Sequence, residues 1–355
     1  MKNKELITID GTAGEGGGQV LRSSLALSLV TGQPFRITGI RAGRPKPGLA
    51  RQHLTAVRAA AEVGQAKVMG DEIGSTDLTY VPRGVKAGDY NFAVGTAGSA
   101  TLVLQTVLPA LLTADGPSSL AMEGGTHNRN APPYEFIEQA FLPLINRMGP
   151  TVKSVLKRPG FEPAGGGLFT VDIQPCKKLM PLELCERGEL EKCDIRAVVA
   201  HLDEAIGQKE VRAAVKRLNW PEVDVSVERA DHAKCPGNVI LVTAHLKDTT
   251  EVTVGFGRHG ARASKVGNEA GVAMKHFVDS GAAVGRRLAD QIMLPLALAG
   301  GGRFTTLPLS KHSATQIEVI GKFLAVEVEV TEQDRGRVEV AIKARSEKEA
   351  EENTK

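Results

Sequence analysis

Three stretches of this sequence repeat one order of features: an apolar helical run, a glycine stop, a short strand-like segment, a polar loop and a second amphipathic run. They occupy residues 25–63, 108–145 and 294–324. Self-similarity of this kind indicates one supersecondary unit used three times. Because each unit combines short strands with helices, the predicted class is α/β (α+β).

The spacing of the repeats predicts an insertion. The glycines expected to stop the first helix of each unit are Gly32, Gly116 and Gly301, which lie 84 and 185 residues apart. The second interval is 101 residues longer than the first. An additional segment is therefore expected to interrupt the chain before the third unit.

The predicted insert has a pattern of its own. Residues 196–218 have helical apolar spacing, three strand-like runs follow, and residues 269–281 predict a closing helix. We therefore expect a large domain over 1–185 and 281–345, a small inserted domain over 186–280, and a disordered tail over 346–355, which has no apolar anchors.

Composition limits where the chain acts and what it binds. Lys and Arg total 44 against 41 Asp and Glu, a net charge of +3, so any polyanion must be held by a local basic site. No apolar run approaches the roughly 20 residues that cross a bilayer. The four cysteines have no CxxC spacing, and no secretory leader is visible. These features predict a soluble cytoplasmic protein without membrane contact.

A glycine-rich loop, "GEGGG", separates a strand-like run from an apolar helix. Free amides at a helix start can hold phosphate, and glycines allow close approach. The loop also brings Glu15, Gln19 and Arg22, and Glu15 is a candidate ligand for a divalent cation facing phosphates. The alternative is a tight turn without a ligand, since no Gly-Lys-Ser/Thr follows.

A second loop concentrates Arg41 and Arg44 between glycines and the prolines Pro45 and Pro47. Arginine forks suit phosphate oxygens, and prolines hold a loop in place at low entropic cost. We predict phosphate contact for both arginines. The alternative is a solvated charged surface.

His312 lies among small polar residues just ahead of a helical run. In the first helical turn the macrodipole disfavours imidazolium, and a neutral imidazole suits attack on phosphorus. A capping or solvated histidine is the alternative.

His127 is a second candidate, because its loop corresponds to that of His312, whereas His53 and the insert histidines are assigned to surface or packing. If the units pack around a pseudo-symmetric centre, these loops converge into a cationic cleft.

Several motifs together resemble the RNA 3'-terminal phosphate cyclase family. They are "GEGGGQVLR", "IRAGRPKPGLARQHL", "EGGTHNRNAPP", "RPGFEPAGGG", "LADQIMLPLALAG" and the His312 loop, in register over about residues 5–345. The resemblance implies three βαβαββ-type repeats with a smaller inserted α/β domain, which agrees with the spacing above.

The resemblance also implies an activity in three steps. A histidine attacks the α-phosphate of ATP, and the adenylate then moves to an RNA 3'-phosphate. The adjacent 2'-OH finally closes a 2',3'-cyclic ester and expels AMP. The implied partners are ATP, Mg²⁺ or Mn²⁺ and RNA with a 3'-terminal phosphate. The oligomeric state is not predicted.

The same resemblance assigns roles to residues. His312 matches the adenylated nucleophile and Glu15 the metal contact. The residues that match the ATP pocket are Gln19, Arg22, Arg44, Gln105, Pro132, Arg287, Asp290 and Gln291. Two positions depart from the family pattern: Arg287 stands where an aromatic residue stacks on adenine, and His127 where an Asp is common. A guanidinium plane can also stack, so looser ATP specificity is expected.

Two other functions remain open. Cyclase-like RNA-processing or ribosome-assembly factors resemble the family in scaffold but lack the nucleophilic histidine. His312, together with Glu15 and Arg22, argues against them. Enolpyruvyl transferases also stack repeated units around a cleft, but between two large halves, whereas this chain divides unevenly. Labelled ATP separates the cases, because only a cyclase takes up AMP covalently.

Overall fold

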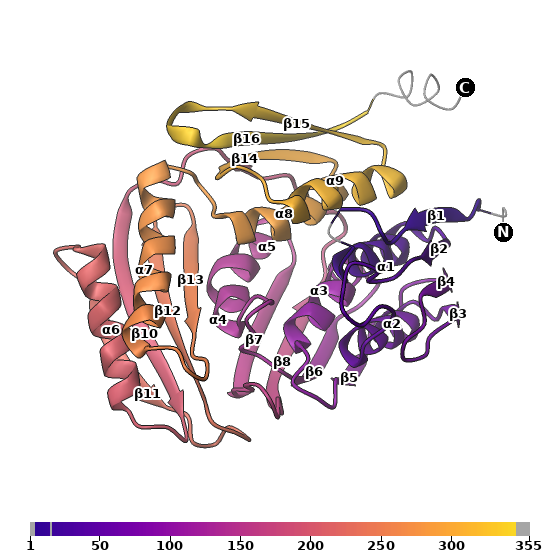
Figure 1. Cartoon of the computed structure of the whole chain (residues 1–355). Helices are drawn as coiled ribbons and strands as arrows, with labels where there is room; N and C mark the ends of the chain where they lie inside the picture. Colours follow the sequence, from indigo (N-terminus) through magenta and orange to yellow (C-terminus); the bar gives the residue numbers. More distant parts are fainter. Residues whose placement is uncertain (1–3, 15, 346–355) are drawn as a thin grey trace.

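The computed structural model describes residues 4–14 and 16–345 (Figure 1). Two predictions lie outside these residues: the metal contact of Glu15 and the disordered tail 346–355. The described chain forms four sheets of four strands each, and helices cover them. The predicted α/β class with three repeated units is confirmed.

The first unit establishes the pattern of the other two. It begins with β1, whose parallel neighbour is β2, and the antiparallel strands β4 and β3 complete the order β1-β2-β4-β3. Its elements in chain order are β1 (Ile7–Asp10), α1 (Gln19–Thr31), β2 (Phe35–Thr38), α2 (Arg51–Val63), β3 (Lys67–Met69) and β4 (Asp77–Val81).

The second unit has the same topology, with the order β5-β6-β8-β7 and one parallel pair, β5 with β6. Its second helix is divided by a π-helical segment. The elements are β5 (Asp89–Ala93), α3 (Ala100–Leu111), β6 (Ser118–Gly124), α4 (Tyr134–Phe136), η1 (Ile137–Phe141), α5 (Leu142–Arg147), β7 (Thr151–Arg158) and β8 (Gly167–Gln174).

The third unit repeats the topology once more, with the order β9-β14-β16-β15. Its first strand, β9, is separated from its first helix, α8, by the insert, which the spacing of the repeats had placed before the whole unit. The elements are β9 (Glu183–Leu184), α8 (Arg286–Leu298), β14 (Gly301–Thr306), α9 (Lys311–Phe323), β15 (Val326–Glu332), the 3₁₀ turn η2 (Asp334–Gly336) and β16 (Val338–Ala344).

The insert forms a separate mixed sheet with the order β11-β10-β12-β13, and α6 packs beside α7 (Figure 1). Its elements are β10 (Leu190–Ala200), α6 (Ala205–Leu218), β11 (Asp224–Arg229), β12 (Gly237–Leu246), β13 (Thr250–Phe256) and α7 (Ala263–Ser280). Figure 1 shows the second unit in the middle, with the insert and the first unit on opposite sides of it.

Two hydrophobic clusters support this arrangement. One joins all three units and includes residues of β12 and β13, and the other lies within the insert, around Ile195, Met274 and Phe277. The insert sheet therefore packs on its own helices and also on the second unit, where β13 contacts α4 and η1. The domain limits at 186 and 280 stay a prediction.

Two local predictions were wrong. Gly32 does end α1 in a left-handed conformation, but α3 ends at Leu111 and α8 at Leu298, so Gly116 and Gly301 lie beyond the helices. Residues 196–200, predicted as helix, belong to β10. This strand is central in its sheet, and a strand buried on both faces has a continuous apolar run that resembles a buried helix.

Candidate active site

Loops from all three units line one open cleft, as expected from the repeats. In the centre of the molecule, α1 packs against α3 and α9, and α8 packs against α9 (Figure 1). The predicted site residues that line the cleft are Gln19, Arg22, Arg41, Arg44, Pro132, Arg287, Asp290, Gln291 and His312. Gln105 lines an adjoining smaller pocket that also includes Gln19, Arg22, Asp290 and Gln291.

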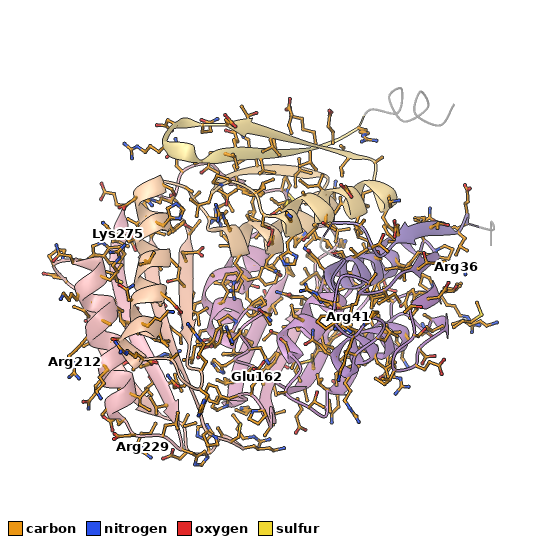
Figure 2. The ribbon with its side chains drawn as sticks, viewed as in Figure 1. Arg36, Arg41, Glu162, Arg212, Arg229 and Lys275 are labelled. Atoms are coloured by element: carbon orange, nitrogen blue, oxygen red, sulfur yellow. The ribbon has the colours of Figure 1, made fainter. Side chains whose placement is uncertain are left out.

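The cleft is electropositive for two reasons. Six arginines line it (22, 41, 44, 129, 286 and 287), against the carboxylates Glu162 and Asp290. Figure 2 shows Arg41 and Glu162, from the first and second units, toward the middle of the molecule. In addition, α1, α2, α3, α8 and α9 all place first-turn or N-cap residues in the lining. Helix starts present free amides and positive dipole ends, so this cleft suits a polyanion.

His312 is the second residue of α9, and the start of this helix is fixed on α8. A capping box joins Ser310 and Ser313, each donating its backbone N–H to the other's Oγ. The Ser313 hydroxyl in turn donates to Asp290 Oδ1. Burial raises the pKa of Asp290, while the hydrogen bond from Ser313 and the charge of His312 oppose this rise. Asp290 thus holds the turn that carries His312.

A chain of two glutamines sets the tautomer of His312. Gln19 Nε2 donates to Gln316 Oε1 (2.9 Å), which directs Gln19 Oε1 toward the imidazole. His312 Nδ1 lies 2.7 Å from this oxygen and must be the donor, because a carbonyl oxygen only accepts. In the neutral ring the lone pair then resides on Nε2. Sequence reasoning missed Gln316, since nothing in the local pattern links it to Gln19.

The glycine loop allows the side chains of Arg44 and His53 to approach the start of α1. A Cβ at Gly17 would lie 3.0 Å from Arg44, and one at Gly18 would lie 2.1 Å from His53 Nε2. Glycine is therefore required at position 18 for steric reasons and not for a left-handed backbone, because its φ is −79°. The loop is both a turn and part of the cleft wall.

Arg22 and Arg41 differ in how they are held. Burial lowers the pKa of Arg22 to about 10, and its guanidinium has no hydrogen-bond or ion-pair partner within residues 4–14 and 16–345. Arg41 donates to the carbonyl oxygens of Lys46 (2.9 Å) and Gly48 (2.7 Å), so its loop is fixed. Burial and the neighbouring Arg44 lower the pKa of Arg41. Both cations are thus short of negative partners, as an anion site requires.

His53 was predicted to be a surface or packing residue, but it lines the cleft. It is buried, and its Nδ1 has no hydrogen-bond partner in the described chain. Burial and the charges of Arg22, Arg41 and Arg44 lower its pKa to about 3, so it is neutral at physiological pH. The sequence signal was its place on the first turn of the helix that follows the arginine loop.

The second unit supplies a polar and apolar wall. Ser99 caps α3, and its N–H donates to Gln52 Oε1 (2.7 Å), which ties the unit to α2. Thr101 donates to the carbonyl oxygen of Pro132 (2.8 Å) and fixes this proline at the cleft. In the smaller pocket, the Nε2 of Gln105 is buried without a hydrogen-bond partner among the described residues.

Arg287 closes the cleft on the side of Pro132. Its NH1 donates to the carbonyl oxygen of Ala131 (2.9 Å), and its guanidinium lies 6.0 Å from the centroid of the Phe136 ring. Burial lowers the pKa of Arg287, while the charges of Glu251 and Asp290 act in the opposite direction. The cationic group thus occupies a fixed place on the wall.

Comparison with known proteins identifies the family of this chain. The family model described as "RNA 3'-terminal phosphate cyclase" matches residues 13–330. The chain belongs to the RNA 3'-terminal phosphate cyclase family. The protein of this name from Koribacter versatilis (strain Ellin345) is 49% identical over 94% of each chain. Those from Ralstonia nicotianae and Salmonella paratyphi C are 49% and 45% identical, each over 95% of this chain and 97% of the relative.

His127, a second candidate nucleophile from sequence, has a different environment in this cyclase-family chain. Its Nδ1 lies 2.8 Å from Thr126 Oγ1 and its Nε2 2.9 Å from Glu135 Oε2, and it is 3% exposed. Arg196 of the insert also bonds Glu135. His127 does not line either pocket. It belongs to a buried network that joins the second unit to the insert.

No group of three or more His, Cys, Asp or Glu side chains capable of holding a metal ion occurs in residues 4–14 and 16–345. No described helix is both long and apolar enough to cross a membrane.

Proposed function

We propose that this protein is an ATP-dependent RNA 3'-terminal phosphate cyclase that acts in the cytoplasm. The observation that carries the proposal is the placement of His312 at the start of α9, in a cleft lined by six arginines. Its Nδ1 donates a hydrogen bond to Gln19 Oε1. Such a cleft is suited to phosphates, and the lone pair on Nε2 is suited to attack on phosphorus.

In the first step, His312 Nε2 attacks the α-phosphorus of ATP. An N–P bond forms, the bond between the α-phosphorus and the bridging oxygen breaks, and pyrophosphate leaves. The ring keeps its Nδ1 proton, and Gln19 Oε1 accepts the hydrogen bond from it. Arg22 and Arg44 neutralise charge on the departing phosphates, which is the main requirement of phosphoryl chemistry.

In the second step, an oxygen of the RNA 3'-phosphate attacks the same phosphorus, the N–P bond breaks, and RNA-(3')pp(5')A forms. In the third step, the 2'-OH attacks the 3'-phosphorus, loses its proton and expels AMP. Activation makes AMP the leaving group, and the adjacent hydroxyl attacks at high effective concentration. Arg41 and Arg44 are proposed to hold the RNA phosphate.

Nucleotide recognition is assigned to the remaining cleft residues: Gln19, Arg22, Arg44, Gln105, Pro132, Arg287, Asp290 and Gln291. Mg²⁺ or Mn²⁺ is proposed to arrive with the phosphates of ATP, since oxygen-rich ligands suit both ions. No step is derived through a protein-bound metal. Asp290 and Glu162 are the carboxylates in the described lining, and Asp290 is bonded to Ser313.

The experiment is incubation with ATP labelled at the α-phosphorus, followed by mapping of the labelled residue. Wild-type protein should take up AMP on His312, and His312→Ala and His312→Asn should not, because neither side chain offers a nucleophilic nitrogen. A melting temperature close to wild type would show that the variants fold. Retained labelling in either variant would remove His312 from the mechanism. A non-catalytic RNA-processing or ribosome-assembly factor, the alternative function, would not be labelled.

A further inference from the structure

The wall formed by Arg287 and Pro132 carries information about the nucleotide base. Arg287 NH1 donates to the carbonyl oxygen of Ala131, the residue before Pro132, so the guanidinium and the proline ring occupy one stretch of the cleft. One helical turn further along α8, Asp290 bonds the turn that carries His312. A nucleotide with its α-phosphate at His312 can therefore reach this wall with its base.

The guanidinium of Arg287 is held from three directions. Ala131 accepts from NH1, the ring of Phe136 lies beneath the guanidinium at 6.0 Å, and the charge of Glu251 acts on it from the insert. Glu251 is itself buried and accepts from the Gly285 N–H (3.0 Å), the N-cap of α8. A side chain fixed in this way loses little freedom when a ligand binds, so its contacts are selective.

Most donors of this guanidinium remain available to a ligand. Of its five N–H groups, one has an acceptor in the part of the chain that the structure describes, the Ala131 carbonyl. Burial lowers the pKa of Arg287, which shows that its charge is poorly solvated, yet an arginine stays protonated at neutral pH. A base that supplies acceptors in the plane of the guanidinium would occupy the unused N–H donors and replace part of the missing solvation of the charge.

Purine bases differ in what they supply. Guanine presents O6 and N7, two adjacent acceptors that match an arginine fork, whereas adenine presents N7 beside the N6 amino donor. A guanidinium can stack on the face of either base. Edge-on contact therefore favours guanine, and stacking is neutral between the two. We propose that Arg287 sets the base selectivity of this site, which takes guanosine triphosphate as a nucleotidyl donor in addition to ATP.

This inference rests on the proposed function, because the same His312 performs the transfer. Nε2 bonds to the α-phosphorus of GTP, the bond from that phosphorus to the bridging oxygen breaks, and pyrophosphate leaves. The product is a GMP adduct of the same linkage. The base does not enter the chemistry, so only binding and positioning distinguish the two nucleotides.

The experiment measures labelling by GTP and by ATP, each carrying label at the α-phosphorus, over a range of concentrations. Wild type should be labelled by both. Arg287→Met keeps the length of the side chain but removes its donors, and should lower the GTP-to-ATP ratio of labelling efficiency about five- to hundredfold. Arg287→Lys keeps the charge without the planar fork, and its GTP-to-ATP ratio should lie between those of wild type and Arg287→Met. Arg258→Met, which alters an arginine paired with Glu269 outside the cleft, is the matched control.

The outcomes separate the two proposals. Labelling of wild type by ATP alone overturns the inference and leaves the proposed function standing. So does an equal GTP-to-ATP ratio in wild type and Arg287→Met. Absence of labelling by either nucleotide refutes the proposed function. If Arg287→Met melts at a lower temperature than wild type, the wild-type GTP measurement and the Arg287→Lys ratio still decide the question.

Discussion

Gln316 offers a direct test of how His312 is oriented. It is 6% exposed and accepts a hydrogen bond from Gln19, whose amide it holds in the orientation that His312 meets. In Gln316→Leu, the Gln19 amide loses its acceptor and can rotate, so that Gln19 Nε2 faces the imidazole of His312. A donor at this position stabilises the His312 tautomer that carries its proton on Nε2. This tautomer cannot attack phosphorus through His312 Nε2.

The size of the effect follows from one hydrogen bond. A net bond of this kind contributes about 0.5–1.5 kcal/mol, and about 1.4 kcal/mol corresponds to a tenfold change in rate. Under single-turnover conditions with labelled ATP, we expect the maximal rate of adduct formation to fall by up to about tenfold. The half-saturating ATP concentration should change little, because Gln316 acts on the orientation of the nucleophile.

Two further variants make this test decisive. Gln316→Glu still offers an acceptor to Gln19 Nε2 and should retain more activity than Gln316→Leu. Gln208→Leu, on the exposed face of α6, is the matched control. A wild-type rate in Gln316→Leu, or equal losses in the Leu and Glu variants, would show that the glutamine chain does not set the tautomer.

Three other outcomes are expected. Glu210 is fully buried and forms no ion pair in the part of the chain that the structure describes. Burial raises its pKa from 4.5 to about 7. The stability of the fold is therefore unaffected by this group below about pH 4.5 and falls as the pH rises toward 7, because the unfolded chain ionises first. Between pH 5 and pH 8, the free energy of unfolding should therefore fall by about 2–3 kcal/mol less in Glu210→Gln than in wild type, as measured by denaturant unfolding. Equal dependence of this free energy on pH in the two proteins would contradict the prediction. Gly18→Ala should slow adduct formation about tenfold by displacing His53, whereas Gly321→Ala, whose Cβ meets nothing within 4 Å, should not. RNA with a 2'-deoxy terminus and a 3'-phosphate should stop at the adenylylated intermediate on a gel, and cyclic product from this end would be unexplained.

Part of the site could be predicted because its signals are local. The small polar residues before a helical run indicated the position of His312, and clustered arginines indicated Arg41 and Arg44. Contacts between distant segments could not be predicted in this way: Gln316 lies 297 residues from Gln19, and only the folded chain brings them together. For the same reason His53 was assigned to packing, although three arginines surround it.

The fold shows the same limit. The repeat pattern predicted three units and an insertion, because periodicity and spacing are properties of the sequence itself. The strand over residues 196–200 was taken for helix, because burial on both faces removes the alternation that marks a strand. Which residues are covered on both sides depends on the finished sheet, and the local sequence does not contain that information.

The position of the insert has a consequence for the order of folding. The third sheet pairs β9 with β14, joining residues 120 apart, so this pairing must close a loop that contains the whole insert. If the insert folds first, its two ends are brought together, and the effective loop between β9 and β14 shrinks from about 120 residues to about 25. The entropic cost of closing this loop then falls by about 1.4 kcal/mol. We therefore expect a change that slows the folding of the insert to delay the assembly of α8 and α9, and with them the cleft.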